Sequence, residues 1–355
     1  MLYDQLRRQL EGLVPLFALS AQAGPILATF DAVCRESLAI DAGRRAPELS
    51  RINADGTPLQ FSVALSRNRS TPLQFVGESG VPGASMEQRR RASFASLRAL
   101  AMSCDVVDEV ECLIPTLCQL APARPELLDN PSGVFWLAPT FWPDAPPSLT
   151  VYVNARWGSP TTQWARLDDV VAFFNITNHW HTIAAGAMPA LSPLGVAFTV
   201  RSQRATSARI YLQAFGEAMR LYRALVTNAV PGHGAADVLD AFRDHVLCLE
   251  DRQPTRSAVF SVELMQGEIV GAKFEHCAHC AFDHDADAAE RIDDWLQRTD
   301  VDAAIYRDTV SHLNFGRTLS NQVLPTLHAY VGVGFRGGEH YTSVYFNPGP
   351  ALDAA

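Results

Sequence analysis

The sequence predicts an α+β fold in which ten antiparallel strands close into a barrel around a central chamber, with helices forming an outer layer. Strand-like pairs rich in β-branched and aromatic residues recur five times along the 355-residue chain. Segments with apolar residues at helical spacing precede each pair, which gives an ααββ unit repeated five times. Because no long linker divides the chain, we expect one domain over residues 1–355, with two separate α+β domains as the alternative.

Each strand pair is expected to form a hairpin, since Gly and Pro clusters punctuate the joins between segments. The hairpins are predicted near residues 59–78, 133–155, 195–215, 258–277 and 327–347. The helices that precede them are predicted, in order, at 3–20 and 26–42, 85–104 and 105–120, 168–177 and about 177–188, 214–229 and 234–250, and 285–299 and 302–316. Closing ten strands removes the edges of the sheet. A ten-stranded barrel is wider than the eight-stranded size that side chains can just fill, so an internal chamber is expected.

Composition and charge narrow the classes of function. With 48% apolar and 19% charged residues the chain is typical of a soluble globular protein, and its net charge of −9 gives no basic footprint for nucleic acid or an anionic membrane. Seven cysteines, an odd number, argue against a disulfide framework and for a reducing compartment. Residues 1–17 lack a signal-peptide pattern and no apolar run approaches the roughly 18 residues of a membrane span, so we expect a cytoplasmic monomer or homodimer.

Side-chain alternation along the strands predicts what lines the chamber. One face of each strand is mostly apolar and should pack outward on the helices, which leaves the polar face inward. The inward set is Thr150, Tyr152 and Asn154, then Ser207, Arg209, Tyr211 and Gln213, then Lys273, Glu275 and Cys277, and finally Tyr330, Arg336, Tyr341, Ser343 and Tyr345. Exposed strand faces also carry Tyr, Arg and Lys, but the pattern repeats on four strands, which favours a binding chamber.

The chemistry of that set favours a substrate that separates into an anion and a carbocation. Arg and Lys in a partly dehydrated chamber need anions, and phosphate oxygens suit them. Tyrosine faces hold a cation through the ring quadrupole while they exclude water. An allylic diphosphate, which ionises to an allylic cation and diphosphate, requires both features.

The last hairpin, "LHAYVGVGFRGGEHYTSVYFNPGP", carries the most specific resemblance to a known family. It resembles the dimethylallyltryptophan-synthase-type aromatic prenyltransferases, whose fold is the ααββ prenyltransferase barrel. That family pairs a shielding Tyr with a diphosphate-binding Arg six residues later and another shielding Tyr nine residues beyond, a spacing that Tyr330, Arg336 and Tyr345 match. In this interpretation Gly332 and Gly334 leave open space on the inward face.

The resemblance extends to the other hairpins and implies further roles. "ARIYL" is similar to the family's Lys-x-Tyr strand, which makes Arg209 a diphosphate ligand and Tyr211 a shield. "LTVYVNAR" keeps a shield at Tyr152, and "GAKFEHCAHC" is similar to the strand of bacterial members that carries a diphosphate-binding lysine, here Lys273. Together with the last hairpin, this gives the diphosphate ligands Arg209, Lys273 and Arg336 and the cation shields Tyr152, Tyr211, Tyr330 and Tyr345.

The first hairpin departs most from the family pattern. Gln60 stands where the family has an acidic residue that accepts the indole N–H, and it can accept that bond without taking a proton. Glu275 is the substitute base, with an ion pair to Lys273 as the equally favoured alternative. Arg67 and Arg69 lie near the position of a missing phosphate-binding arginine, and Arg67 is the candidate for its role. Neutral residues occupy three usual cationic positions, at Gln74, Thr150 and Ser207.

The resemblance implies metal-independent transfer of a dimethylallyl or geranyl group from its diphosphate to an electron-rich aromatic, with an indole or tryptophan-derived metabolite as the expected acceptor. The sequence has no DDxxD motif, so no Mg²⁺ and no other cofactor is expected. "HCAHCAFDHD" at 276–285 lacks a second ligand pair for zinc, so no metal is expected there. Because three of the usual cationic positions are neutral, two alternatives stay open. One is a cyclase or other small-molecule enzyme on the same barrel, and the other is a non-catalytic binder of aromatic ligands.

Overall fold

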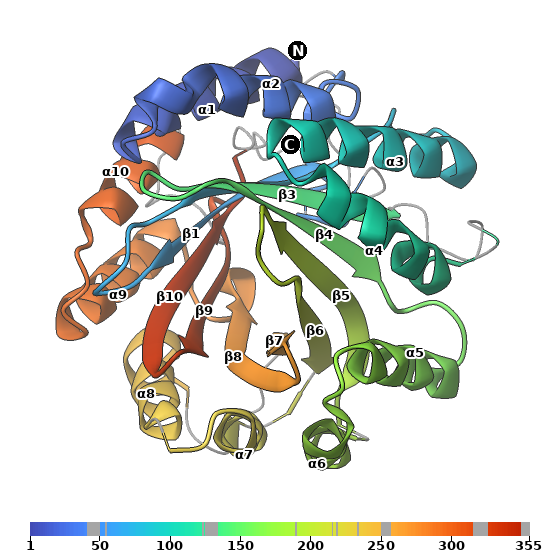
Figure 1. Cartoon of the computed structure of the whole chain (residues 1–355). Helices are drawn as coiled ribbons and strands as arrows, with labels where there is room; N and C mark the ends of the chain where they lie inside the picture. The colour runs from blue at the N-terminus through green and yellow to red at the C-terminus, as the bar shows by residue number, and fades with distance from the viewer. Residues whose placement is uncertain are drawn as a thin grey trace.

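The computed structural model describes residues 1–40, 50–53, 55–122, 124, 134–188, 190–214, 216–217, 219–232, 234–249, 257–314 and 326–348. Within these ranges two helices and a hairpin follow one another five times (Figure 1). Among the described residues, no helix combines the length and apolar character needed to cross a bilayer.

Ten strands form a single closed antiparallel barrel, in which strands that follow one another in sequence are neighbours. They are β1 Leu59–Leu65, β2 Leu73–Glu78, β3 Phe135–Phe141, β4 Ser148–Asn154, β5 Ser192–Arg201, β6 Ser207–Ala214, β7 Ala258–Met265, β8 Glu268–Cys277, β9 His328–Arg336 and β10 Glu339–Phe346. The barrel closes where β1 pairs with β10, with Phe61 opposite Phe346. The predicted fold class is therefore confirmed.

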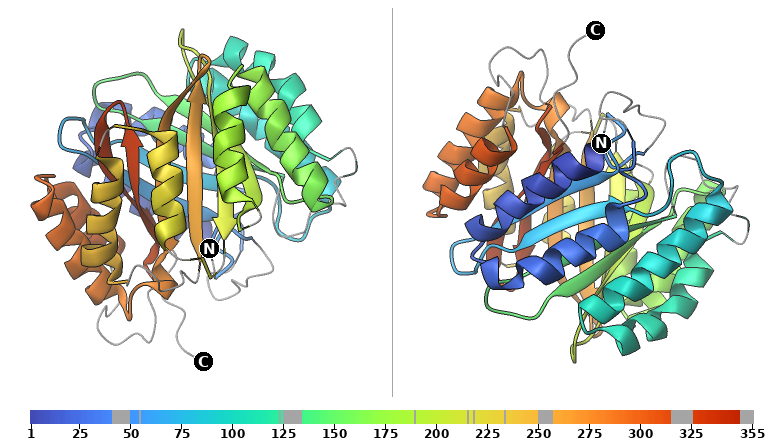
Figure 2. Two further views of the ribbon diagram at one scale, coloured as in Figure 1. Left: turned by 90° about the horizontal axis from the view of Figure 1, so that it is seen from below. Right: turned by 90° about the horizontal axis from the view of Figure 1, so that it is seen from above.

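The ten α-helices of the described residues surround the barrel and cover its outer face (Figures 1 and 2). They are α1 Leu2–Leu16, α2 Ala23–Cys34, α3 Met86–Ser103, α4 Val107–Leu120, α5 Pro160–Phe173, α6 Thr177–Ala187, α7 Met219–Ala229, α8 Ala235–Phe242, α9 Asp285–Arg298 and α10 Ala304–Leu313. Local sequence fixes several starts. Ser85 and Gln88 form a capping box at α3, and Ser159 caps α5 directly before Pro160.

The apolar core lies between the helices and the outward face of the barrel. On β9 the outward side chains Val331, Val333 and Phe335 are at most 4% exposed. The same face of β6 buries Ile210 and Leu212 completely. The polar residues of alternate parity therefore face the interior of the barrel, as the sequence predicted.

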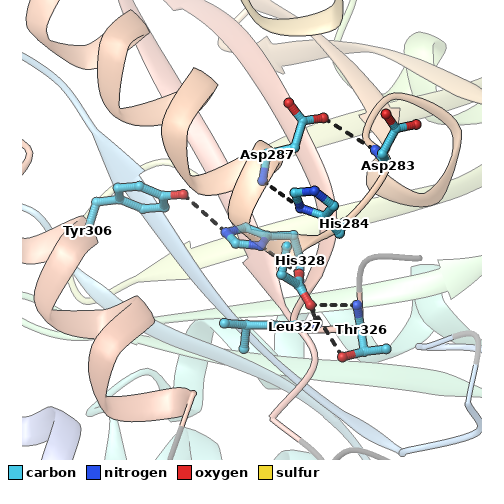
Figure 3. A network of polar contacts seen from close by, with 8 residues as sticks. Asp283, His284, Asp287, Tyr306, Thr326, Leu327 and His328 are labelled. Carbon is cyan, nitrogen blue, oxygen red and sulfur yellow. Dashed lines mark hydrogen bonds and ion pairs between the residues drawn. The ribbon is translucent and has the colours of Figure 1, made fainter. Parts of the chain in front are cut away.

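A buried polar cluster joins the start of α9 to the start of β9 (Figure 3). The carboxylate of Asp285 accepts backbone N–H bonds from Thr326, Leu327 and His328, and it contacts His328 Nδ1 at 2.8 Å. The other ring nitrogen of His328 lies 3.1 Å from the hydroxyl of Tyr306 on α10. Since α9 and α10 hold the last hairpin through this cluster, it helps to position the residues that β9 and β10 send into the barrel.

Candidate functional site

Among the described residues, a cavity on one side of the barrel interior meets a second cavity at a shared layer of three tyrosines, Tyr152, Tyr211 and Tyr345. The first, of about 190 Å³, is the cationic compartment, lined among others by Arg69, Arg201, Arg209, Glu263, Lys273, Arg336, Glu339 and Tyr341. The second, of about 260 Å³, is the aromatic compartment, lined among others by Ile52, Gln60, Val76, Trp136, Arg156, Gln213, Glu275 and Tyr330. The barrel thus separates a charged space from a mostly apolar one.

The four predicted shielding tyrosines all line the aromatic compartment, three of them at its boundary with the cationic compartment and Tyr330 beside Tyr345. The ring centroids of Tyr152 and Tyr211 are 5.9 Å apart, and those of Tyr330 and Tyr345 are 6.5 Å apart with nearly perpendicular planes. Burial raises the pKa of all four phenols above the usual value, so they stay neutral at any physiological pH. Neutral aromatic faces around a confined space are suited to a carbocation.

Five cations and two carboxylates line the cationic compartment, which leaves it with a net positive charge. Three of the cations are the predicted ligands Arg209, Lys273 and Arg336, which come from β6, β8 and β9. Burial lowers the pKa of Arg201, and the positive charge of Arg336 lowers it further, because the two guanidinium groups share this space. An anion bound here would relieve that repulsion.

Glu263 on β7 bridges two of the predicted diphosphate ligands. Its Oε2 lies 2.7 Å from Arg209 Nη2, and its Oε1 lies 3.0 Å from Arg336 Nη2. Burial would raise the pKa of Glu263, but the charges of Arg209 and Arg336 outweigh it and the pKa is lowered. Glu263 is therefore ionised and holds the two arginines side by side across the strands β6, β7, β8 and β9.

Lys273 stands at the boundary between the two compartments. Its Nζ lies 2.8 Å from Glu275 Oε1, hydrogen-bonds the hydroxyl of Tyr345, and sits 4.9 Å from the centroid of that ring. Both charged side chains are buried, at 4% and 8% exposure. The ion pair expected as the alternative for Glu275 is therefore present, while its carboxylate also borders the aromatic compartment.

Hydrogen bonds organise the wall of the aromatic compartment. Gln60 Nε2 donates to Asn53 Oδ1 at 3.1 Å, which fixes the amide and leaves its carbonyl as the acceptor. The indole N–H of Trp136 donates to Glu78 Oε1 at 2.6 Å, and Arg89 of α3 pairs with Oε2 of the same carboxylate at 2.6 Å. Burial raises the pKa of Glu78 to about 7. Trp136 is thereby fixed as a rigid aromatic wall.

Two of the neutral residues at usual cationic positions, Gln74 and Thr150, hydrogen-bond polar side chains of the neighbouring strands. Gln74 accepts from Ser62 at 2.7 Å and donates to Thr140 at 2.8 Å. The hydroxyl of Thr150 lies 2.9 Å from that of Thr199. This side of the cationic compartment, formed by β1 to β5, is therefore polar and uncharged except for Arg69 and Arg201.

Two expectations from the sequence are wrong. Arg67 does not reach the chamber: its side chain is 66% exposed and pairs with Asp300 at 3.3 Å, because the turn after β1 carries it past the barrel rim. Nor do Gly332 and Gly334 leave open space. A Cβ at Gly334 would lie 2.2 Å from the ring of Tyr341, and one at Gly332 would lie 2.4 Å from the Phe274 carbonyl oxygen. The glycines instead allow the Tyr341 ring and the neighbouring strand to approach closely.

The Cys and His residues of 276–285 do not gather around a common point. Within the described ranges, no three His, Cys, Asp or Glu side chains are placed to hold a metal ion. Cys277 and Cys280 are half-buried near the end of β8, where burial raises the pKa of Cys277 to about 12. His276 lies fully buried on the outward face.

Sequence reasoning missed Glu263 and Arg201, and it noted Arg69 without assigning it a role. Strand alternation could have identified Glu263 and Arg201 as inward-facing residues. Glu263 shares its face of the strand with Val259 and Ser261. Arg201 shares its face with Ala197 and Thr199. The register that sets Glu263 opposite Arg209 depends on how β6 pairs with β7. Arg69 lies in a turn, where alternation gives no prediction.

Comparison with solved structures places the fold among known proteins. The chain is similar to 5-dimethylallyltryptophan synthase from Streptomyces coelicolor, with a TM-score of 0.84 and 17% identity over 100% of this chain and 99% of that one. It is also similar to 6-dimethylallyltryptophan synthase from Micromonospora olivasterospora in complex with DMASPP and Trp (TM-score 0.82, 17% identity, 97% and 96% covered). Prenyltransferase PriB gives a TM-score of 0.80 at 19% identity, with 98% and 96% covered. No family model and no curated protein matches the sequence. The shared architecture is the ααββ prenyltransferase barrel.

Proposed function

We propose that the protein is an aromatic prenyltransferase that moves an allylic group from its diphosphate to an electron-rich aromatic ring. The observation that carries this proposal is the tyrosine layer between a cationic and an aromatic compartment. Solved proteins of the same fold that are named for dimethylallyltryptophan synthesis, one of them in complex with DMASPP and Trp, support the choice of substrates. An indole or tryptophan-derived acceptor is therefore the first candidate.

In the proposed reaction the diphosphate binds to Arg209, Lys273 and Arg336. The bond between the allylic carbon and the diphosphate oxygen breaks, and both electrons leave with the diphosphate. Charge-assisted hydrogen bonds of this type contribute about 1.5–3 kcal/mol each, and they strengthen as negative charge develops on the leaving oxygen. Because these side chains supply the positive charge, we propose that the transfer needs no Mg²⁺.

The allylic cation then lies against the faces of Tyr152, Tyr211, Tyr330 and Tyr345. These rings exclude water, which would otherwise capture the cation. The aromatic ring attacks from its own compartment and forms the new carbon–carbon bond. A proton leaves the attacked carbon, and Glu275 is the carboxylate that borders the aromatic compartment and can accept it. Gln60 offers a carbonyl to an acceptor N–H.

The test is to incubate the protein with dimethylallyl or geranyl diphosphate and a panel of indoles and phenols, with and without EDTA. We expect diphosphate release that depends on the acceptor, a prenylated product by mass spectrometry, and equal rates in EDTA. Arg336→Gln should lower the rate at least tenfold, since one charge-assisted contact is lost. Absence of release with every donor–acceptor pair would refute the proposal.

One observation favours a second candidate, a different small-molecule enzyme on the same barrel. The carboxylate of Glu263 is already paired with Arg209 and Arg336. The site therefore attracts a highly charged anion less strongly than it would if both arginines were unpaired. A cyclase acting on a prenylated aromatic without diphosphate chemistry would fit such a site. Failure of inorganic diphosphate to bind, with binding of an aromatic ligand, would favour this candidate.

A further inference from the structure

Lys273 and Glu275 form an ion pair that crosses the boundary between the two compartments. They are successive inward-facing residues of β8, and Lys273 lines the cationic compartment while Glu275 lines the aromatic one. Nζ of Lys273 lies 2.8 Å from Oε1 of Glu275, which is hydrogen-bond distance. The pair therefore links the space proposed for the leaving group to the space proposed for the aromatic ring.

The surroundings of the pair leave its two members as each other's partners for proton exchange. Among the described residues, those beside the pair in the strand register carry no ionisable side chain: they are Val259, Ser261, Gly332 and Gly334. A Cβ at Gly332 would lie 2.8 Å from Cγ of Glu275, so a larger residue there would displace the carboxylate. The hydroxyl of Tyr345 hydrogen-bonds Lys273, and this phenol stays neutral because burial and then the charge of Glu275 raise its pKa. A proton that reaches Glu275 can therefore pass to Lys273 without entering solvent.

The proposed reaction releases a proton on one side of the tyrosine layer and creates a base on the other. When the allylic carbon–oxygen bond breaks, the diphosphate gains negative charge in the cationic compartment. When the new carbon–carbon bond has formed, the attacked ring carbon loses a proton in the aromatic compartment. Because the tyrosines keep water away from the cation, a proton path made of side chains is favoured over one made of water.

We propose that Glu275 and Lys273 relay the proton of the aromatic ring to the departing diphosphate. This inference rests on the proposed function and deepens it. Nζ of Lys273 gives a proton to the diphosphate oxygen that leaves with the electron pair of the broken carbon–oxygen bond. Glu275 takes the proton of the attacked carbon, whose bonding electrons return to the ring, and passes it to the neutral Lys273 amine. The pair ends each turnover in its starting charge state, and the products are the prenylated ring and hydrogen diphosphate.

Lys273→Arg separates proton donation from positive charge. Arginine retains the charge that binds diphosphate, but its guanidinium keeps its protons in proteins. At saturating dimethylallyl diphosphate and an accepted indole, we expect kcat to fall about 100-fold, as is typical when a general acid is lost. The Kd of inorganic diphosphate, measured by calorimetric titration, should stay near the wild-type value. Arg209→Lys is the matched control: it also exchanges one cation for another at a proposed diphosphate ligand, and it should lower kcat by less than about tenfold.

Chemical rescue decides the matter if Lys273→Arg does not fold, as judged by its thermal melt, or loses diphosphate affinity. In Lys273→Ala, methylammonium supplies a charge and a proton, whereas tetramethylammonium supplies only a charge. Restoration of kcat by methylammonium alone supports the relay. Equal effects of the two ions, including no rescue by either, overturn it.

The outcomes separate the relay from the proposed function. If Lys273→Arg retains a kcat within about tenfold of the wild-type value, the relay is wrong, while the prenyl transfer itself still supports the proposed function. If the wild type transfers no prenyl group to any acceptor, both are wrong.

Discussion

The carboxylate of Glu263 offers the sharpest test of the cationic compartment. Glu263→Gln keeps the shape of the side chain and removes the negative charge that bridges Arg209 and Arg336, at 2.7 and 3.0 Å. The variant should be less stable without ligand, because two guanidinium groups then face each other without a counterion. It should also bind inorganic diphosphate more tightly, because a like charge has left the anion site.

The magnitude follows from the geometry. Two unit charges about 4 Å apart attract by about 4 kcal/mol at an effective dielectric constant of 20. Desolvation of the carboxylate offsets much of this, and breaking a buried pair typically costs about 3–5 kcal/mol. The arginines are 21% and 26% exposed, so we expect the lower end, about 3 kcal/mol. If diphosphate restores about half to all of that loss, its affinity should rise about 10- to 100-fold.

Thermal melts and calorimetric titrations with inorganic diphosphate measure both effects. Without ligand the variant should melt below the wild type, and saturating diphosphate should narrow the difference, since a ligand stabilises the state that binds it. Glu78→Gln is the matched control: it removes a buried Glu–Arg pair that lies outside the cationic compartment, and it should leave diphosphate affinity unchanged. If Glu263→Gln binds diphosphate no more tightly than the wild type does, the assignment of this compartment to an anionic ligand is wrong.

The remaining predictions concern the rim, the buried cluster and the wall. Arg67→Gln should transfer prenyl groups at the wild-type rate, measured by diphosphate release, because Arg67 pairs with Asp300 outside the chamber; a tenfold loss would contradict its placement. Burial raises the pKa of Asp285, but the hydrogen bond and charge of His328 outweigh it and the pKa is lowered. The ionised Asp285 carboxylate therefore stabilises the fold above pH 3.8, the ordinary pKa of the group, and this stabilisation is lost as the pH falls further. The melting temperature should fall less between pH 7 and pH 3 in Asp285→Asn than in the wild type. Glu78 should have the opposite effect on how stability depends on pH, because its pKa is raised to about 7. The protonated Glu78 side chain is favoured in the folded state, so its stabilisation is complete below pH 4.5 and is lost as the pH rises through 7. From pH 5 to pH 8, Glu78→Gln should therefore lose less stability than the wild type. An equal loss in both proteins would show that Glu78 is already ionised at pH 5.

The fold was predictable because it depends on repetition and alternation. Five hairpins in sequence, each after two amphipathic segments, leave few arrangements that cover every strand edge. Strand parity then assigned the inward face, and Tyr152, Tyr211, Tyr330 and Tyr345 lie together as that parity requires. These are local properties of the chain, and a single sequence contains them.

The electrostatic partners of the site were less predictable, because they depend on registers between strands. Glu263 pairs with Arg209 and Arg336 only because β7 lies between β6 and β8 in the observed alignment, and no local pattern specifies that alignment. The prediction that Arg67 lies in the chamber was wrong for a related reason. Arg67 lies in a turn, where the alternation of inward and outward side chains along a strand does not apply. Gly334 was misinterpreted because the Tyr341 ring that fills its space comes from the opposite strand of the hairpin.

The closure of the barrel by β1 and β10 also has a consequence for folding. The pairing of Phe61 with Phe346 joins the first and last strands of the sheet, so it carries the largest loop-closure entropy of any strand contact in the described barrel. Contacts this distant in sequence slow folding, and until they form, β1 and the last hairpin present unpaired edges. Tyr345 lies within that final pairing, opposite Ser62. The enclosed chamber therefore exists only in the fully closed chain, and a partly folded intermediate would have neither the sealed cavity nor the complete ring of tyrosines.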